Sequence, residues 1–225
     1  MNTFFSGLAV ATLVSVCSGG AFAATLINGA TQGFYNDAIG DLNTGAAPFP
    51  CPSSSCGDPN IDYGPGDAGV INGALAGNAA LGDWLTNPAA PGGSWSAGPV
   101  AIPASWAVNS ETAIIYAIDA GTTGLSNVLA SFGVDNGLFV WLNGTFLGGQ
   151  LRPGGVVAGE FELATGNLAA GTNYLQILRE DHGGSAGYSV LVTGDVSAVP
   201  LPAAGWLMLA GVGGLAALGR RRKAA

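Results

Sequence analysis

Short apolar runs separated by turn residues dominate the second half of the chain. β-Branched and aromatic residues that alternate with polar ones, or that continue for a few positions, are typical of strands. Asn143-Gly144 lies between two of these runs and is the commonest signal for a type I′ hairpin. The pattern predicts no helix here, so the fold class is all-β, an antiparallel β-sandwich. The predicted strands are Thr112–Ile118, Val128–Val134, Leu138–Leu142, Thr145–Leu147, Glu160–Leu163, Asn173–Leu178 and Tyr188–Thr193.

Residues Thr25–Pro103 form the less regular part of the chain. Prolines interrupt this part repeatedly, with glycines between them, so we expect long loops and a few edge strands. Trp84, Trp95 and Trp106 are spread through it. Because so few charges surround them, we expect these side chains to pack in the core or beneath loops. The prolines before Pro103 are Pro48, Pro50, Pro52, Pro59, Pro65, Pro88, Pro91 and Pro99.

The N-terminal segment Met1–Ala23 carries no charged side chain and has an apolar stretch from Leu8 to Val16. Small residues at Ala21 and Ala23 fit the pattern that signal peptidase cleaves. The segment is therefore predicted to be a signal peptide, cut after Ala23. Acylation of Cys17, as in a lipoprotein, is an alternative.

The C-terminal segment combines an uncharged apolar stretch with a basic run that follows it. Residues 203–219 carry no charge and reach the short limit for a transmembrane helix. The basic run that follows should stay in the cytoplasm by the positive-inside rule. A plain membrane anchor explains this pattern as well. The basic run is Arg220, Arg221, Arg222 and Lys223.

A short motif precedes the apolar stretch, and the three elements together resemble the VPLPA variant of the PEP-CTERM sorting signal. The resemblance covers residues 199–225 and implies a Gram-negative exopolysaccharide producer. It implies that an exosortase cuts near the motif and releases or transfers the protein outward. Partners would be signal peptidase and exosortase, with the inner membrane as a transient location and the cell surface or extracellular matrix as the final one. The motif is Val199, Pro200, Leu201, Pro202 and Ala203.

Composition supports a folded exported body at 24–198. The whole chain is 48% apolar and 9% charged, with 38 Gly and 12 Pro, which disfavours a helical bundle. Its net charge is −8, yet all 14 carboxylates precede the sorting signal while only Arg152 and Arg179 oppose them there. Nucleic-acid binding needs a basic patch and is not expected. The body divides into a loop-rich part, 24–100, and a part with regular strands, 101–195.

The order of three motifs in the second part resembles the galactose-binding-like jelly roll of glycoside-hydrolase accessory domains. The motifs lie in Phe132–Gly137, Phe139–Gly144 and Leu168–Leu175, and the resemblance covers Ala101–Asp195. These are turn and strand signals, so they identify the fold better than the ligand. The resemblance admits a carbohydrate-binding module in which Trp141 or Tyr188 contacts a sugar.

Cys51 and Cys56 are the thiols that remain after signal removal. Export places them in an oxidising compartment, so a small-loop disulfide is predicted. A zinc site is the rival interpretation, but two cysteines without nearby ligands do not complete zinc's four.

Asp58, Asn60 and Asp62 place side-chain oxygens at alternate positions, as the start of a calcium loop does. Tyr63 and Gly69 occupy positions where an EF-hand has Gly and Glu. A turn rich in Asp and Asn explains the same residues without a metal, so no cofactor is assigned beyond this calcium candidate.

Catalytic constellations are not predicted. His182 lies in the charged cluster Arg179–Gly184, yet no nucleophile motif accompanies it, and a polar loop at a sheet edge explains the cluster. Glu160 and Glu162 alternate on one predicted strand, which does not place them on two sides of a substrate. The protein is therefore predicted to be a non-enzyme. Its predicted role is a surface or matrix interaction associated with exopolysaccharide, and the alternative is the carbohydrate-binding module.

Overall fold

The computed structural model describes residues 22–42, 60–152, 154–181, 184–196 and 211. Residues Phe22–Ser197 form one compact unit, which is described here by itself. Among the described residues, none belongs to a helix of the length and apolarity needed to cross a membrane. Several predicted features lie outside the described residues: residues 1–21 of the signal peptide, Cys51, Cys56, Asp58, His182, the sorting motif, most of the 203–219 helix and the basic run.

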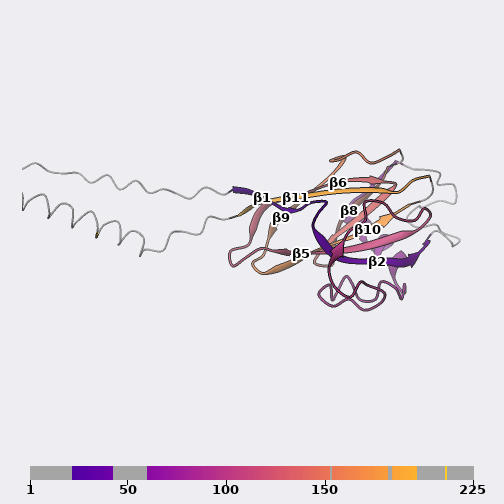
Figure 1. Ribbon diagram of the computed structural model, residues 1–225, viewed down its shortest axis with the longest axis horizontal. Coiled ribbons are helices and arrows are strands. Elements are labelled where there is room, and N and C mark those ends of the chain that lie inside the picture. The colour runs from indigo at the N-terminus through magenta and orange to yellow at the C-terminus, as the bar shows by residue number, and fades with distance from the viewer. Residues whose placement is uncertain (1–21, 43–59, 153, 182–183, 197–210, 212–225) are drawn as a thin grey trace, which may run out of the picture. The chain divides into compact units, whose positions relative to one another are not determined.

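Two antiparallel sheets make up this unit (Figure 1). All seven predicted strands are present and most are extended by a few residues, which confirms the all-β antiparallel class. The strand predicted for Glu160–Leu163 begins one residue later, at Phe161, so Glu160 lies outside it. The four-stranded sheet has the order β1 (Phe22–Ile27), β11 (Gly187–Val196), β6 (Leu125–Asp135) and β9 (Phe161–Leu168). The seven-stranded sheet has the order β3 (Ile61–Tyr63), β8 (Thr145–Leu151), β7 (Gly137–Leu142), β10 (Thr172–Glu180), β5 (Glu111–Asp119), β2 (Gln32–Gly40) and β4 (Val100–Ala101).

The β7–β8 hairpin turns at Asn143 and Gly144. Their φ angles are 49° and 78°. A type I′ turn requires positive φ at both central residues, and its twist matches that of the two strands. The hairpin predicted from Asn143-Gly144 is therefore confirmed.

The main hydrophobic core lies between the two sheets. Alternate residues of each strand point inward, so each sheet contributes one of its faces. Val140 and Ile177 of the seven-stranded sheet pack in the same cluster as Phe132 and Val192 of the four-stranded sheet, and all four are at most 2% exposed. This cluster holds the two sheets together.

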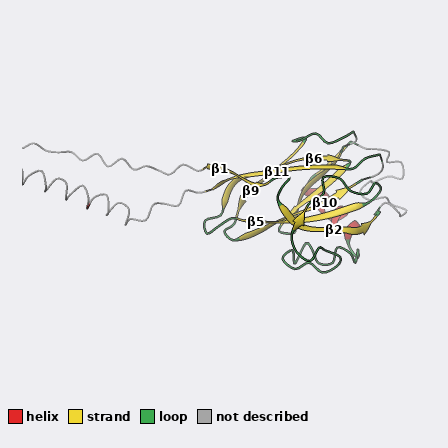
Figure 2. Cartoon of the chain, in the orientation of Figure 1, coloured by secondary structure: helices red, strands yellow, loops and turns green. Residues whose placement is uncertain are grey.

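A second core covers the outer face of the seven-stranded sheet, and it contains a helix that the sequence does not predict. Helix α1 (Ala68–Leu75) follows the short 3-10 helix η1 (Pro65–Asp67), and Figure 2 shows these helical segments in red among the strands. Ile71 and Leu75 of α1 are buried one turn apart against Phe139 and Trp141 of β7. Gly69 and Gly73 lower the intrinsic helix propensity of so short a segment, and tertiary packing stabilises it instead.

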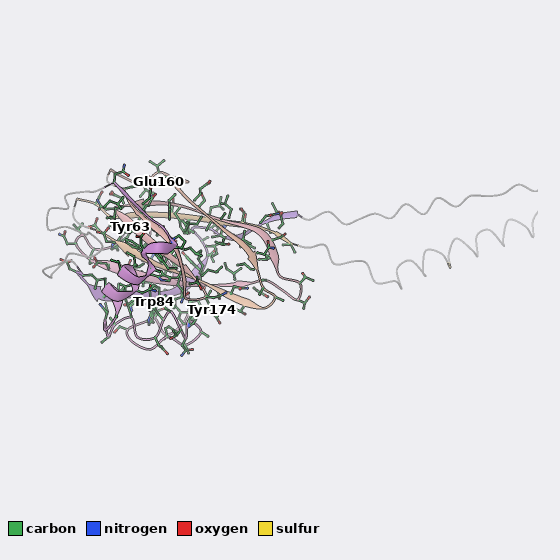
Figure 3. The ribbon with its side chains drawn as sticks, turned by 180° about the vertical axis from the view of Figure 1, so that it is seen from behind. Tyr63, Trp84, Glu160 and Tyr174 are labelled. Atoms are coloured by element: carbon green, nitrogen blue, oxygen red, sulfur yellow. The ribbon has the colours of Figure 1, made fainter. Side chains whose placement is uncertain are left out.

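The loop that follows α1 is anchored by two of the tryptophans. Trp84 is 3% exposed, and its ring stacks on that of Trp95 with centroids 5.9 Å apart. The buried amide of Gln176 in β10 donates to the Trp84 carbonyl at 2.6 Å. Trp84 lies beside α1 in Figure 3, in the same cluster as Ile71. The predicted packing role of these tryptophans is confirmed, and the loop-rich part becomes a third layer over the sheet.

Candidate binding site at one end of the sandwich

The strand register gives the sandwich two distinct ends. In the four-stranded sheet Phe22 pairs with Val196, and Val196 pairs with Leu125. The indigo β1 and the orange β11 lie side by side in Figure 1. At the other end of the same strands, Gly187 pairs with Asp135. We call the end with Phe22 and Val196 the terminal end, and the end with Asp135 and Gly187 the far end.

The seven-stranded sheet brings further strand ends to the far end. Asp135 ends β6, and after one residue Gly137 begins β7. Gly137 pairs with Glu180 of β10 on one side and with Leu151 of β8 on the other. Glu111, which begins β5, also pairs with the last residue of β2. Strands from both sheets therefore meet at one edge of the molecule.

Buried polar side chains gather at the far end. Glu111, Asp135, Asn136, Glu180 and Asp181 are each less than 10% exposed. Asp135 accepts a hydrogen bond at 2.8 Å from a serine of the loop before β11, and Asp181 accepts one at 2.8 Å from the backbone of the loop before β5. Buried carboxylates of this kind fix the ends of strands and the loops between them.

The location of the Arg179–Gly184 cluster differs from the prediction. We expect a polar loop at a sheet edge, but Arg179 and Glu180 belong to β10, which lies between β7 and β5 inside the seven-stranded sheet. Both side chains are fully buried. For these two residues the prediction is wrong, because strand β10 continues through them, while Asp181 follows the strand.

Arg179 points between the sheets into a group of aromatic rings. Its guanidinium carbon lies 4.3 Å from the ring centre of Trp106, 5.0 Å from that of Tyr188 and 5.5 Å from that of Tyr35. Ring faces attract cations, most strongly where water is excluded. Burial lowers the pKa of Arg179 from its ordinary value. Its nitrogens donate to Thr112 Oγ1 at 2.9 Å, to the Pro103 carbonyl at 2.7 Å and to Tyr35 Oη at 3.3 Å.

Trp141 and Tyr188 do not form an exposed sugar platform. Trp141 is 0% exposed beneath α1, where its indole nitrogen donates to Asn72 Oδ1 at 2.9 Å. Tyr188 is 8% exposed, and burial raises the pKa of its hydroxyl well above the ordinary value. A sugar platform needs an open ring face, so the prediction of these two residues as ligand contacts is wrong. Both faces of β7 are apolar because the third layer covers the outer one.

Two of the three predicted calcium ligands contact an arginine instead. Arg152 forms an ion pair with Asp62 at 2.5 Å and donates a second hydrogen bond to Asn60 Oδ1. No group of three or more His, Cys, Asp or Glu side chains suited to a metal occurs in the part of the chain that the structure describes. Asn60 and Asp62 thus bind the Arg152 guanidinium, while Asp58 lies outside the described residues.

Glu111 is a far-end residue that the sequence pattern does not identify. Leu42 donates its backbone N–H to Glu111 Oε2 at 2.8 Å, while Oε1 is buried without a hydrogen-bond partner. Burial raises the pKa of this carboxyl from 4.5 to about 8, and the charges of Asp41 and Asp181 contribute in the same direction. The signal in the sequence is a single carboxylate directly before the apolar run of β5.

Glu160 and Glu162 both act on strand β6. Glu160 Oε1, labelled in Figure 3, accepts the backbone N–H of Val134 at 2.7 Å, and Glu162 Oε1 accepts the hydroxyl of Ser131 at 3.3 Å. The two side chains therefore fasten the edge strand β9 and the loop before it to β6. Paired carboxylates of a glycosidase lie on opposite sides of the scissile bond, which is not the arrangement here.

Comparisons with known proteins add little. No protein-family model and no curated protein matches the chain. Among solved structures, it is similar to a PA14 sugar-binding domain from an RTX adhesin, with 15% identity over 73% of this chain and 90% of that one and a TM-score of 0.34. It is also similar to the PA14 domain of the MpAFP antifreeze protein, with 16% identity over 80% and 86% and a TM-score of 0.31. At these values neither a fold nor a ligand is carried over to this chain.

Proposed function

We propose that this chain is an exported, non-enzymatic interaction protein that an exosortase sorts to the cell surface or the extracellular matrix. The signal-peptide pattern before Ala24 supports export. The VPLPA motif, the uncharged stretch and the basic run support the sorting route, in which these residues are a substrate. A body of two packed sheets with a third covering layer supports a stable domain between the two signals.

The pairing of β1 with β11 is the observation that carries the functional proposal. Because Phe22 and Val196 are partners, both segments that lead toward the membrane leave the sandwich at its terminal end. The far end is therefore the end of the sandwich remote from both of these chain exits. A surface protein meets its ligand at the end it presents outward.

We propose an extracellular polysaccharide as the ligand of the far end. Sugar hydroxyls both donate and accept hydrogen bonds, and the far end carries amide, carboxylate, hydroxyl and guanidinium groups in Asn60, Asp62, Ser185 and Arg152. The resemblance to accessory domains of glycoside hydrolases supports a binding role of jelly-roll type. Aromatic stacking on Trp141 or Tyr188 is not part of this proposal, because both rings are buried.

Retention on polysaccharide tests the ligand. The protein recovered from outside the cell is passed over immobilised exopolysaccharide from its own producer, and retention is expected. The double variant Asp62→Asn/Arg152→Gln removes an ion pair at the far end without leaving one charge behind. Retention should fall at least about tenfold because neutral amides replace a carboxylate and a guanidinium, and hydrogen bonds from neutral groups are weaker than charge-assisted ones. Asp119→Asn is the matched control at the terminal end. Equal retention of both variants contradicts a far-end site.

Mass spectrometry of the same material tests the sorting route. The exported chain should end near Val199–Ala203. Material outside the cell that still carries Arg220–Lys223 would show that the C-terminal segment is an ordinary anchor or is shed by another route.

A further inference from the structure

Positive charge is scarce in the exported segment. Besides Arg152, which pairs with Asp62, and Arg179, which is buried among rings, residues 24–198 contain no lysine or arginine. The sequence has one lysine, Lys223, within the basic run. Cleavage after Ala23 therefore generates a new cation and, once the tail is removed, the single amino group of the protein.

The predicted scissile bond lies within strand β1. Ala23 pairs with Asp195 of β11, and Ala24 pairs with Gly194. Directly paired residues in an antiparallel sheet lie about 5 Å apart. The nitrogen of Ala24, which follows the partner of Asp195, is therefore within reach of the Asp195 side chain. Ala23 is exposed on the face that it shares with Asp195, so its removal leaves open space beside the carboxylate.

Asp195 is held in position before any cleavage. Asn127 Nδ2 donates to Asp195 Oδ2 at 2.7 Å. Asn127 has a φ of 52° where the register of β6 with β11 shifts between Asp195 and Thr193, so a local bulge directs this amide toward the carboxylate. The other oxygen, Oδ1, makes no hydrogen bond to the described residues. A carboxylate with one oxygen fixed and one available is a prepared acceptor for a cation.

We propose that signal cleavage creates an ion pair between the α-ammonium of Ala24 and the carboxylate of Asp195, which fastens the shortened β1 to β11. This rests on the export part of the proposed function. Hydrolysis adds the hydroxyl of water to the Ala23 carbonyl and its hydrogen to the Ala24 nitrogen, and the amine then takes a proton from solvent. The strand loses the pairs made by Phe22 and Ala23, and the ion pair replaces part of that attachment.

The pH range of the ion pair follows from the groups around it. Residues 24–27 of β1 carry no ionisable side chain, and Asp195 is the ionisable acid of β11. On β5, which also contacts β1, the acids are Glu111 at the far end and Asp119. An α-amino group that gains a partner has a raised pKa, so its contribution is complete below about pH 8, the ordinary value, and disappears as pH rises through the raised value.

A chemical double-mutant cycle tests the inference on the exported protein. Acetylation neutralises the α-amine, and mass spectrometry should count one acetyl group. In the wild type at pH 6.5, acetylation should raise the unfolding equilibrium constant roughly two- to fivefold, as expected for an exposed ion pair. In Asp195→Asn the effect should vanish. Asp37→Asn, an exposed aspartate in the other sheet, is the matched control and should respond as the wild type does.

The outcomes separate the inference from the function on which it rests. N-terminal sequencing that begins at Ala24, with equal effects of acetylation in wild type and Asp195→Asn, overturns the ion pair and leaves export intact. A first residue other than Ala24 overturns both the proposed cleavage and the ion pair. The effect of acetylation in the wild type should disappear at pH 10, where the amine is neutral. If it still exceeds the effect in Asp195→Asn by as much as at pH 6.5, the ion pair is overturned.

Discussion

At the scale of single residues, the buried charges separate into two kinds. Arg179 keeps its charge among aromatic rings and neutral oxygens, whereas Glu111 is held next to other acids and is neutral below about pH 8. Desolvation opposes both charges, but the arginine has three hydrogen-bond acceptors and the glutamate has one donor. The fold therefore keeps Arg179 charged in its interior and keeps Glu111 protonated below about pH 8.

Replacing Glu111 tests this difference through pH. Because its pKa rises from 4.5 to about 8, the unfolded chain releases a proton that the folded chain keeps, and stability falls as pH rises between these values. Glu111→Gln mimics the protonated acid and should be roughly 2–4 kcal/mol more stable than the wild type at pH 9. Urea unfolding from pH 4.5 to pH 9 measures the slope. Glu162→Gln changes an exposed side chain and should leave the slope of stability against pH as in the wild type. If Glu111→Gln also kept the wild-type slope, the interpretation would be refuted.

Replacing Arg179 by lysine separates charge from geometry. Lysine keeps the cation but presents a compact ammonium in place of the planar fork that reaches Thr112, Pro103 and Tyr35. Arg179→Lys should therefore cost about 2–4 kcal/mol of unfolding free energy, since buried acceptors lose their donors. The same change at partly exposed Arg152 should cost less than about 1 kcal/mol. Equal costs in thermal or urea unfolding would mean that the charge alone matters at Arg179.

The environments of these residues can be predicted from the sequence to different degrees. Trp84 and Trp95 are predictable as packing residues because so few charged residues surround them in the sequence. Trp141 cannot be placed from its strand alone, since both faces of β7 are apolar and helix α1, which covers it, comes from residues more than sixty positions earlier. Glu111 and Arg179 each end or begin an apolar run, and their burial depends on neighbouring strands that no local pattern identifies.

At the scale of elements, strands are predictable and their partners are not. Period-two patterns and the Asn143-Gly144 turn locate the strands of the second part, because each strand presents its own alternation. The order within each sheet depends on which apolar faces meet after collapse. Helix α1 is not predicted because its two glycines lower the helix propensity and interrupt the apolar pattern. Ile71 and Leu75 nevertheless have the spacing of a buried helical face.

Truncating one side chain of α1 tests the third layer. Leu75 is 5% exposed in the second core, so Leu75→Ala should cost about 2–4 kcal/mol through lost burial and a residual cavity. Val70→Ala is the matched control on the same helix, because Val70 is 71% exposed, and it should change stability by less than about 0.5 kcal/mol. Unfolding followed by tryptophan fluorescence measures both, since Trp84 and Trp141 report on this layer. A neutral Leu75→Ala would mean that the layer adds no stability to the sheet.

At the scale of the whole molecule, net charge opposes compactness. Residues 24–198 have two arginines against 14 carboxylates, and Glu111 reduces that excess while it is protonated. Self-repulsion of this size destabilises a folded acidic protein and is weakened by screening.

Salt should therefore stabilise the exported protein. Raising sodium chloride from about 20 mM to about 500 mM shortens the screening length to a few ångströms, so the thermal midpoint at pH 7 should rise by a few degrees. The same addition at pH 4, where many carboxylates are protonated, should have a smaller effect. A midpoint that falls with salt at pH 7 would mean that attractive pairs outweigh the repulsion.

The pairing of the first strand with the last also sets the order of folding. Strand β1 is the first strand of the domain and its partner β11 is the last, so the four-stranded sheet closes only when almost the whole domain is available to fold. A contact between such distant positions is slow to form because the intervening chain must first be ordered. The pairing of β1 with β11 is therefore expected to be among the last contacts of the domain to form.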